Sequence, residues 1–229
     1  MPDLPRVVGF DGDDTLWHNE TIFSMTQERF RALIGAHVDL PGDAIDARLV
    51  ETERQNLATY GYGIKGFVLS MLETAIAITD GRIPARDIET ILGFGRSMLA
   101  HPVQLIDGAR EVLTTLRERD HELWLLTKGD LFDQESKLAR SGLSVFFERI
   151  EIVSEKDEAT YRRLLDRYGV SPDEFAMIGN SLRSDVLPVV AIGARALHVP
   201  YAITWAHETV AARPDAAFET LAHLREVLG

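Results

Sequence analysis

Three carboxylates, Asp11, Asp13 and Asp14, stand within four positions directly after the apolar run "RVVGF". Like charges at this spacing repel one another, so the cluster is either an acidic turn exposed to water or a site that holds a positive charge. A calcium-binding loop fits Asp11, Asp13 and Thr15 loosely, but Leu16 stands where that loop needs glycine, and no helix precedes it. Carboxylate oxygens are ligands that Mg2+ prefers, and a bound cation would offset their repulsion.

Further polar residues lie at or just after the ends of later apolar runs. Thr127 ends "ELWLLT" and Lys128 follows it, Lys156 comes just beyond "RIEIV", and Asn180 and Asp185 follow "FAMIG". Taken singly, each has an ordinary interpretation: a strand-end threonine, a solvated lysine, or an aspartate stabilised by a helix dipole. Together, and in this order, they predict one polar site built from segments far apart in the sequence.

The apolar runs are apolar throughout rather than alternating, which is typical of strands buried on both faces of a parallel sheet. Helical patterns separate them, and this alternation predicts an α/β fold with a doubly wound parallel sheet. Ligands bind at the carboxyl ends of the strands in such sheets. The predicted strands are 6–10, 122–127, 149–153, 175–179 and 194–199, and the predicted helices are 108–119, 131–142, 157–169 and 184–193.

Residues 18–100 break this rhythm, because they show consecutive helical patterns and no convincing strand. We therefore predict an all-helical cap domain over 18–100, inserted into an α/β core formed by residues 1–17 and 101–229. The segment "GYGIKG" matches the glycine pattern of a nucleotide-binding loop, but it follows a charged helical stretch and no strand. A turn between two insert helices is the prediction there, with Lys65, Tyr60 and Tyr62 as candidates for substrate contact.

Composition excludes several classes of function. The net charge of -12 argues against a protein that binds nucleic acid or an anionic membrane surface. Cysteine is absent, which excludes disulfides and thiolate metal sites, and the seven histidines lack zinc-site spacing. No apolar run approaches the roughly 20 residues of a membrane helix, and no secretory signal pattern opens the chain, so a cytoplasmic protein is expected. Trp205 and His207 fit packing, the surface or an edge of the site equally well.

The order of these residues resembles the haloacid dehalogenase-like (HAD) hydrolases, which are mostly magnesium-dependent phosphatases with a Rossmann-like core. Their motifs are D-x-D-x-T after a strand, a strand-end Ser or Thr, a lysine near a helix start, and G-D-x-x-x-x-D. In this chain the matching residues are, in order, Asp11, Asp13 and Thr15; Thr127; Lys156; and Gly179 and Asp185, with Asn180 in place of an aspartate. The resemblance covers residues 6–16 and about 101–200, and the helical insert resembles the cap of many members.

The resemblance implies hydrolysis of a small phosphorylated metabolite through an aspartyl-phosphate intermediate. Asp11 would attack phosphorus, and Asp13 would protonate the leaving oxygen and then deprotonate water. Thr127 would donate a hydrogen bond to the phosphoryl group, and Lys156 would stabilise the charge in flight, with Lys128 as a rival for that role. A cap that closes over the site favours a small molecule over a protein substrate.

The resemblance also implies a Mg2+ site made by Asp11, the backbone carbonyl of Asp13, Asp185 and Asn180. An amide oxygen carries no formal charge, so we expect weaker magnesium binding than with aspartate at position 180. Asn180 also leaves open a protein that binds a phosphorylated ligand without turnover. A 2-haloacid dehalogenase is disfavoured, because that reaction needs neither the acid of Asp13 nor a metal, while a phosphomutase remains a variant that the sequence allows.

Overall fold

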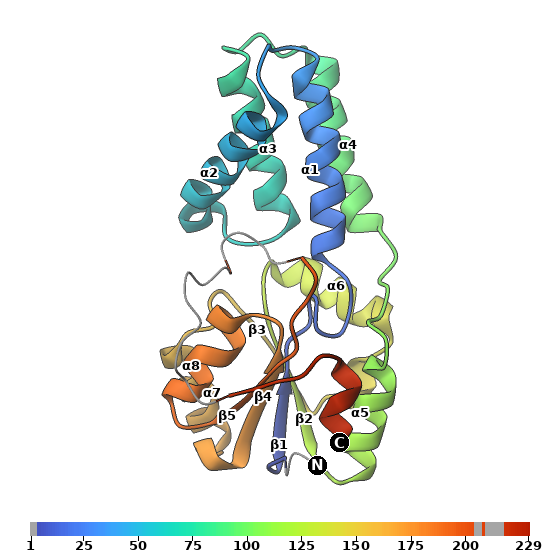
Figure 1. Ribbon diagram of the computed structural model, residues 1–229, viewed down its shortest axis with the longest axis vertical. Coiled ribbons are helices and arrows are strands. Elements are labelled where there is room, and N and C mark those ends of the chain that lie inside the picture. Colours follow the sequence, from blue (N-terminus) through green and yellow to red (C-terminus); the bar gives the residue numbers. More distant parts are fainter. Residues whose placement is uncertain (1–3, 204–207, 209–217) are drawn as a thin grey trace. The chain divides into compact units, whose positions relative to one another are not determined.

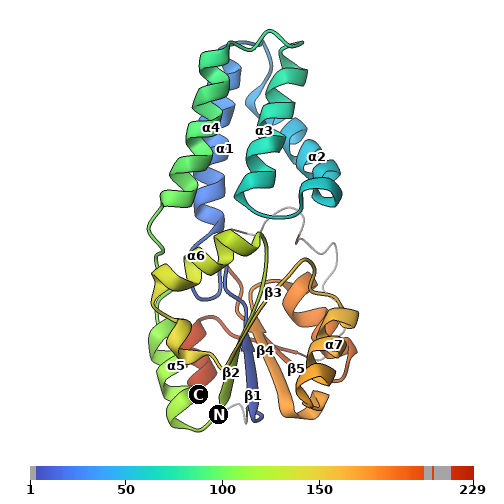
Figure 2. The same cartoon turned by 180° about the vertical axis from the view of Figure 1, so that it is seen from behind.

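The computed structural model describes residues 4–203, 208 and 218–229 of the chain, so Trp205 and His207 lie outside the described residues. Its parallel strands form one sheet in the order β3-β2-β1-β4-β5-β6 (Figures 1 and 2). The strands are β1 Val7–Phe10, β2 Glu122–Lys128, β3 Arg149–Val153, β4 Phe175–Gly179, β5 Arg195–His198 and β6 Glu219–Thr220. The predicted α/β fold with a parallel sheet is confirmed, and β6 is a short strand that the sequence pattern did not indicate.

Helices cover both faces of this sheet and also form a separate group (Figure 1). They are α1 Glu20–Gly35, α2 Gly42–Tyr60, α3 Ile64–Ile78, α4 Ala85–Ala100, α5 Ala109–Glu118, α6 Leu131–Ser141, α7 Glu158–Tyr168 and α8 Leu187–Ala191. No helix in the described part of the chain is both long enough and apolar enough to span a membrane.

Each central strand divides its side chains between two hydrophobic clusters, one on each face of the sheet. In β1, Val8 and Phe10 belong to one cluster, together with buried residues of α5, and Val7 belongs to the other, with residues of α7 and α8. Trp124 and Leu125 of β2 are divided between the clusters in the same way. Because helices cover both faces of the sheet, the residues on both sides of each central strand are buried. The sequence of these strands therefore shows no alternation of apolar and polar residues.

The register of the sheet brings three segments with polar residues to one edge. Phe10, the last residue of β1, pairs with Leu125 of β2 on one side and with Ile178 of β4 on the other. All three strands run in the same direction, so Asp11 and the residues that follow β2 and β4 emerge side by side at their carboxyl ends.

The predicted helix over 184–193 is wrong in its first part. Residues 182–186 form a single π-helical turn, and the α-helix that follows is α8. Pro188 has no backbone N–H to donate to the carbonyl of Ser184, four residues earlier, and the Tyr161 hydroxyl donates to that carbonyl instead, at 2.9 Å. This turn is what carries Ser184 and Asp185 to the sheet edge.

The chain divides into two compact units. The first, called here the core unit, contains residues 1–20, 103–128 and 134–229, and the second, the helical unit, contains residues 21–102 and 129–133. The sequence analysis placed 129–133 with the core, whereas the structure groups it with the helices. Lys65 explains this grouping, because its Nζ forms an ion pair with Asp130 at 2.9 Å.

The helical unit buries a carboxylate in its own core. On α2 the buried residues Ile45, Leu49 and Glu53 recur every four positions, so Glu53 lies on the apolar stripe of the helix. Burial raises the pKa of Glu53 from 4.5 to about 7. Because the folded pKa exceeds the unfolded one, this carboxylate lowers stability as pH rises through this range, and the loss is complete above about pH 7.

We therefore expect Glu53→Gln to increase the free energy of unfolding by up to about 3 kcal/mol at pH 8.5, and by less than about 1 kcal/mol at pH 5. Denaturant titrations at both pH values measure this difference. Glu28→Gln, the same change at an exposed position of α1, is the matched control and should leave both values nearly unchanged. An equal effect of Glu53→Gln at both pH values would contradict the assignment.

Candidate active site

The loop after β1 is a tight turn fixed to the sheet edge. The N–H of Asp11 still donates to the carbonyl of Ile178 in β4 at 2.9 Å, and the N–H of Leu16 closes the turn on the carbonyl of Gly12, also at 2.9 Å. Gly12 is required here, because a Cβ at that position would lie only 2.6 Å from the indole of Trp17. The turn therefore fixes where the three carboxylates of this segment point.

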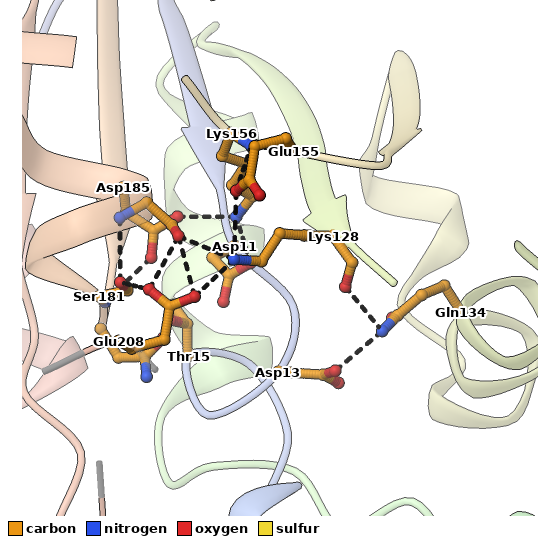
Figure 3. A network of polar contacts seen from close by, with 12 residues as sticks. Asp11, Asp13, Thr15, Lys128, Gln134, Glu155, Lys156, Ser181, Asp185 and Glu208 are labelled. Atoms are coloured by element: carbon orange, nitrogen blue, oxygen red, sulfur yellow. Dashed lines mark hydrogen bonds and ion pairs between the residues drawn. The ribbon is translucent and has the colours of Figure 1, made fainter. Parts of the chain in front are cut away.

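Asp11, Lys156 and Asp185 form a buried group of three charges. Their exposed fractions are 7%, 4% and 1%. The Lys156 ammonium donates to Asp185 Oδ1 at 2.7 Å and also to Asp11 Oδ1 (Figure 3). Lys156 lies between β3 and α7, where the next residue, Asp157, caps the helix by accepting from the Thr160 N–H at 2.8 Å. The ammonium thus links segments that follow three different strands.

The charges of this group depend on one another. Burial alone would lower the pKa of Lys156, but Asp11 and Asp185 outweigh burial and raise its pKa, so the ammonium stays protonated. Burial raises the pKa of Asp11 to about 8, with Lys156 acting against the shift and Asp185 adding to it. A further positive charge beside Asp11 would favour its ionised form at neutral pH.

Asn180 contacts the same loop through its side-chain amide. One terminal atom of the amide lies 3.2 Å from the carbonyl oxygen of Asp13 and 3.3 Å from Asp11 Oδ2 and from Thr15 Oγ1. Without a cation the amide nitrogen fits this position, because it can donate to these oxygens. With a cation, the amide oxygen would take the same place beside the oxygens of Asp11 and Asp13.

The oxygens near Asp11 could hold a hard cation only as a mixed set of carboxylate, carbonyl and amide ligands. Among the described residues no three side chains of His, Cys, Asp or Glu gather into a metal-binding group. The oxygens close to one another are instead a carboxylate of Asp11, a main-chain carbonyl of Asp13 and the amide of Asn180. Asp185 is connected to Asp11 through Lys156. Mg2+ accepts such a set when waters complete its coordination.

Asp13 makes its contacts away from Asp11, with three hydrogen-bond donors. Its carboxylate accepts from the indole N–H of Trp17 at 2.6 Å, from Gln134 Nε2 at 2.8 Å and from Lys137 Nζ at 2.9 Å. Figure 3 shows the side chain turned toward Gln134. Sequence reasoning missed Gln134 and Lys137. The available signal was that both lie on the face of α6 that also buries Leu138, where apolar residues are expected.

The third carboxylate of the cluster has a different environment. Asp14 adopts a left-handed backbone with φ of 60° and is 7% exposed. Its Oδ1 accepts from the N–H groups of Asn19 at 2.8 Å and Glu20 at 3.1 Å, where α1 begins. Burial raises its pKa to about 7, and the hydrogen bond from Asn19 acts in the opposite direction. Asp14 therefore organises the end of the loop.

Thr127 and Lys128 follow one another in β2 but have different surroundings. The hydroxyl of Thr127 is buried, faces the backbone of Gly12, and has no hydrogen-bond partner among the described residues. A buried donor of this kind is rare in folded proteins and indicates a position where a ligand oxygen fits. Lys128 instead contacts Glu208, at 2.5 Å, and Ser184, at 3.0 Å. Sequence reasoning missed Glu208, which no motif or spacing indicates.

The residues predicted from the sequence thus form neighbouring contact groups in the core unit. One contains Asp11, Lys156 and Asp185, with the Asn180 amide beside Asp11; the others centre on Asp13 and on Lys128. At the carboxyl edge of the sheet the fold therefore brings together buried carboxylates, a buried lysine and a threonine hydroxyl that has no hydrogen-bond partner among the described residues.

Comparison with known proteins shows the family to which the chain belongs. The family model described as haloacid dehalogenase-like hydrolase matches residues 5–193, and the chain belongs to this family. A solved haloacid dehalogenase-like family hydrolase from Xanthomonas campestris is 43% identical, with a TM-score of 0.85, over 98% of this chain and 90% of that one. The resemblance predicted from the motifs is therefore confirmed.

Two curated relatives match over shorter stretches. Pyrimidine 5'-nucleotidase PynA of Streptococcus pneumoniae is 32% identical over 94 residues, which is 38% of this chain and 40% of the relative. Phosphoserine phosphatase of Thermus thermophilus is 32% identical over 124 residues, or 52% of this chain and 49% of the relative. The chain thus spans no more than about half the length of these relatives.

Proposed function

We propose that this protein is a Mg2+-dependent phosphatase that hydrolyses a small phosphate monoester through an aspartyl-phosphate on Asp11. The observation that carries this proposal is the buried Asp11–Lys156–Asp185 group at the sheet edge where Thr127 ends its strand, with a hydroxyl that has no partner among the described residues. Two matched relatives are named as a nucleotidase and as a phosphoserine phosphatase, and both names describe cleavage of phosphate esters.

In the first step a carboxylate oxygen of Asp11 bonds to phosphorus as the bond to the leaving oxygen breaks, and Asp13 gives that oxygen a proton. In the second, Asp13 takes a proton from water, whose oxygen bonds to phosphorus while the bond to Asp11 breaks. Thr127 donates to a phosphoryl oxygen, and Lys156 offsets the charge that develops around phosphorus, which is worth several kcal/mol in comparable sites.

Mg2+ would be held by Asp11, the carbonyl of Asp13, Asn180 and Asp185. When bound, it supplies positive charge that offsets the dianionic phosphate and the carboxylates around it. Without Mg2+ these residues bond to one another, because the amide of Asn180 can donate to Asp11 and to the Asp13 carbonyl. In this way the oxygens stay close together whether or not the ion is present.

Asp13 needs two states in this reaction. Trp17, Gln134 and Lys137 donate to its carboxylate and fix where the side chain lies. As the acid it donates the proton that it took from water in the second step of the preceding turnover. Lys137 is therefore a positioning residue for Asp13.

The direct test is release of phosphate from an aryl phosphate and from a panel of small phosphate monoesters, with and without magnesium. We expect metal-dependent turnover that falls at least about a thousandfold in Asp11→Asn, since the nucleophile is removed. Binding of phosphate esters without turnover by the folded, magnesium-saturated protein would contradict hydrolysis. It would support the alternative that the protein binds a phosphorylated ligand without turnover. The presence of asparagine at position 180, where the motif has aspartate, favours that alternative.

Asn180→Asp should tighten magnesium binding by about tenfold, because a charged oxygen replaces a neutral one beside Asp11. It should also lower the melting temperature in EDTA, since two carboxylates would then face each other without a metal ion between them. Calorimetric titration with MgCl2 and thermal unfolding measure the two effects. Asn56→Asp, the same change in the helical unit, should leave the magnesium affinity unaltered, and unchanged or weaker binding by Asn180→Asp would refute the assigned ligand set.

Lys137→Met should lower kcat by about 10- to 100-fold with little change in KM, because Asp13 acts in bond making and breaking rather than in binding. Lys137→Arg keeps a cation beside Asp13 and should recover much of the loss. Steady-state kinetics on the best substrate of the panel provide both values. A rise in KM without a fall in kcat would assign Lys137 to substrate binding instead.

A further inference from the structure

A second group of polar contacts lies next to the proposed phosphoryl site. The carboxylate of Glu208 accepts from Lys128 Nζ at 2.5 Å, from Ser184 Oγ at 2.8 Å and from the hydroxyl of Ser181 (Figure 3). Lys128 also donates to Ser184 Oγ at 3.0 Å. These residues come from β2, from the turn after β4 and from the chain beyond β5, and all belong to the core unit.

Lys128, Ser181 and Ser184 together form a group of donors around one carboxylate. One ammonium and two hydroxyls surround the two oxygens of Glu208, so each oxygen has a donor. Although burial acts to raise it, Lys128 and the two serines hold the pKa of Glu208 below its usual value. Glu208 is therefore bound as an anion.

This donor group adjoins the proposed catalytic residues through the backbone. Lys128 directly follows Thr127, and Ser184 directly precedes Asp185. The Ser181 N–H donates to Asp185 Oδ2 at 3.0 Å, so the turn that carries the two serines also fixes Asp185. The side chains of Lys128 and Glu208 are 12% and 14% exposed, so this ion pair keeps some contact with solvent.

We propose that Lys128, Ser181 and Ser184 form a carboxylate subsite, and that Glu208 fills it until a substrate carboxylate takes its place. The inference rests on the proposed function, since it places this subsite beside the phosphoryl group of the same substrate. A phosphate dianion that enters next to Glu208 is repelled by it, and a carboxylate that displaces Glu208 inherits all three of its donors. The substrate class is a phosphate monoester that also carries a carboxylate.

The test compares phosphonates that differ only in the carboxylate, because these are not hydrolysed and report binding alone. Phosphonoacetate and 3-phosphonopropionate are paired with ethylphosphonate and propylphosphonate, and calorimetry gives each Kd in magnesium. We expect the full chain to prefer the carboxylate-bearing member of at least one pair. Glu208→Gln should increase that preference by about tenfold, and Lys128→Met should reduce it by about tenfold.

Glu155→Gln is the matched control. Glu155 also approaches Lys128, at 3.5 Å, but its side chain is 44% exposed and bonds neither serine, so its removal should leave the preference unchanged. Glu208→Gln could instead weaken the binding of both phosphonates of a pair equally, or show no preference for the carboxylate-bearing one. Either result would show that Glu208 has a fixed structural role and would overturn the subsite. A preserved preference without phosphate release from any ester would retain the subsite and overturn only the phosphatase.

Discussion

The structure of the core unit depends on one buried cation between two carboxylates. Lys156 pairs with Asp11 and Asp185, and all three groups are almost without contact to water. Removing ions from water is strongly unfavourable, so each charge is tolerated only because the other two are present. The first loop, the segment before α7 and the turn after β4 must therefore reach the same point in the folded chain. This requirement explains why the three segments are short and why each is fixed by local hydrogen bonds.

The sheet could be predicted because its signal is local. Strands covered on both faces are apolar at every position, as in β4, which lies at the predicted residues 175–179. β3 also lies at the predicted residues, 149–153, although it is more exposed and contains Arg149 and Glu151. The turn at 182–186 could not be predicted from apolar periodicity, because it depends on the missing N–H of Pro188 and on a hydroxyl from α7. Residues 129–133 were misplaced for a similar reason, since their grouping rests on Asp130 and the distant Lys65.

Motif spacing names the candidate site residues, but the contacts of these residues depend on the fold. Motif spacing identifies Asp11 and Asp13 as a pair, yet the fold gives Asp11 a lysine from beyond β3 and Asp13 a lysine from α6. Asp14, with the same side chain, accepts hydrogen bonds from backbone N–H groups instead. Three carboxylates within four positions therefore have three different environments, although they share one residue type.

Charge balance connects the amide of Asn180 with the second lysine of the site. An aspartate at position 180 would add a carboxylate beside Asp11, whereas the amide leaves Asp11 and Asp185 as the two carboxylates paired with Lys156. Lys128 then adds a second ammonium close to the sheet edge, and without an anion beside it this half-buried charge would be poorly compensated. Glu208 supplies that anion from within the chain. An amide at position 180 and the ammonium of Lys128 both favour a second negative group on the ligand, and under our proposal Glu208 holds the place of that group until such a ligand arrives.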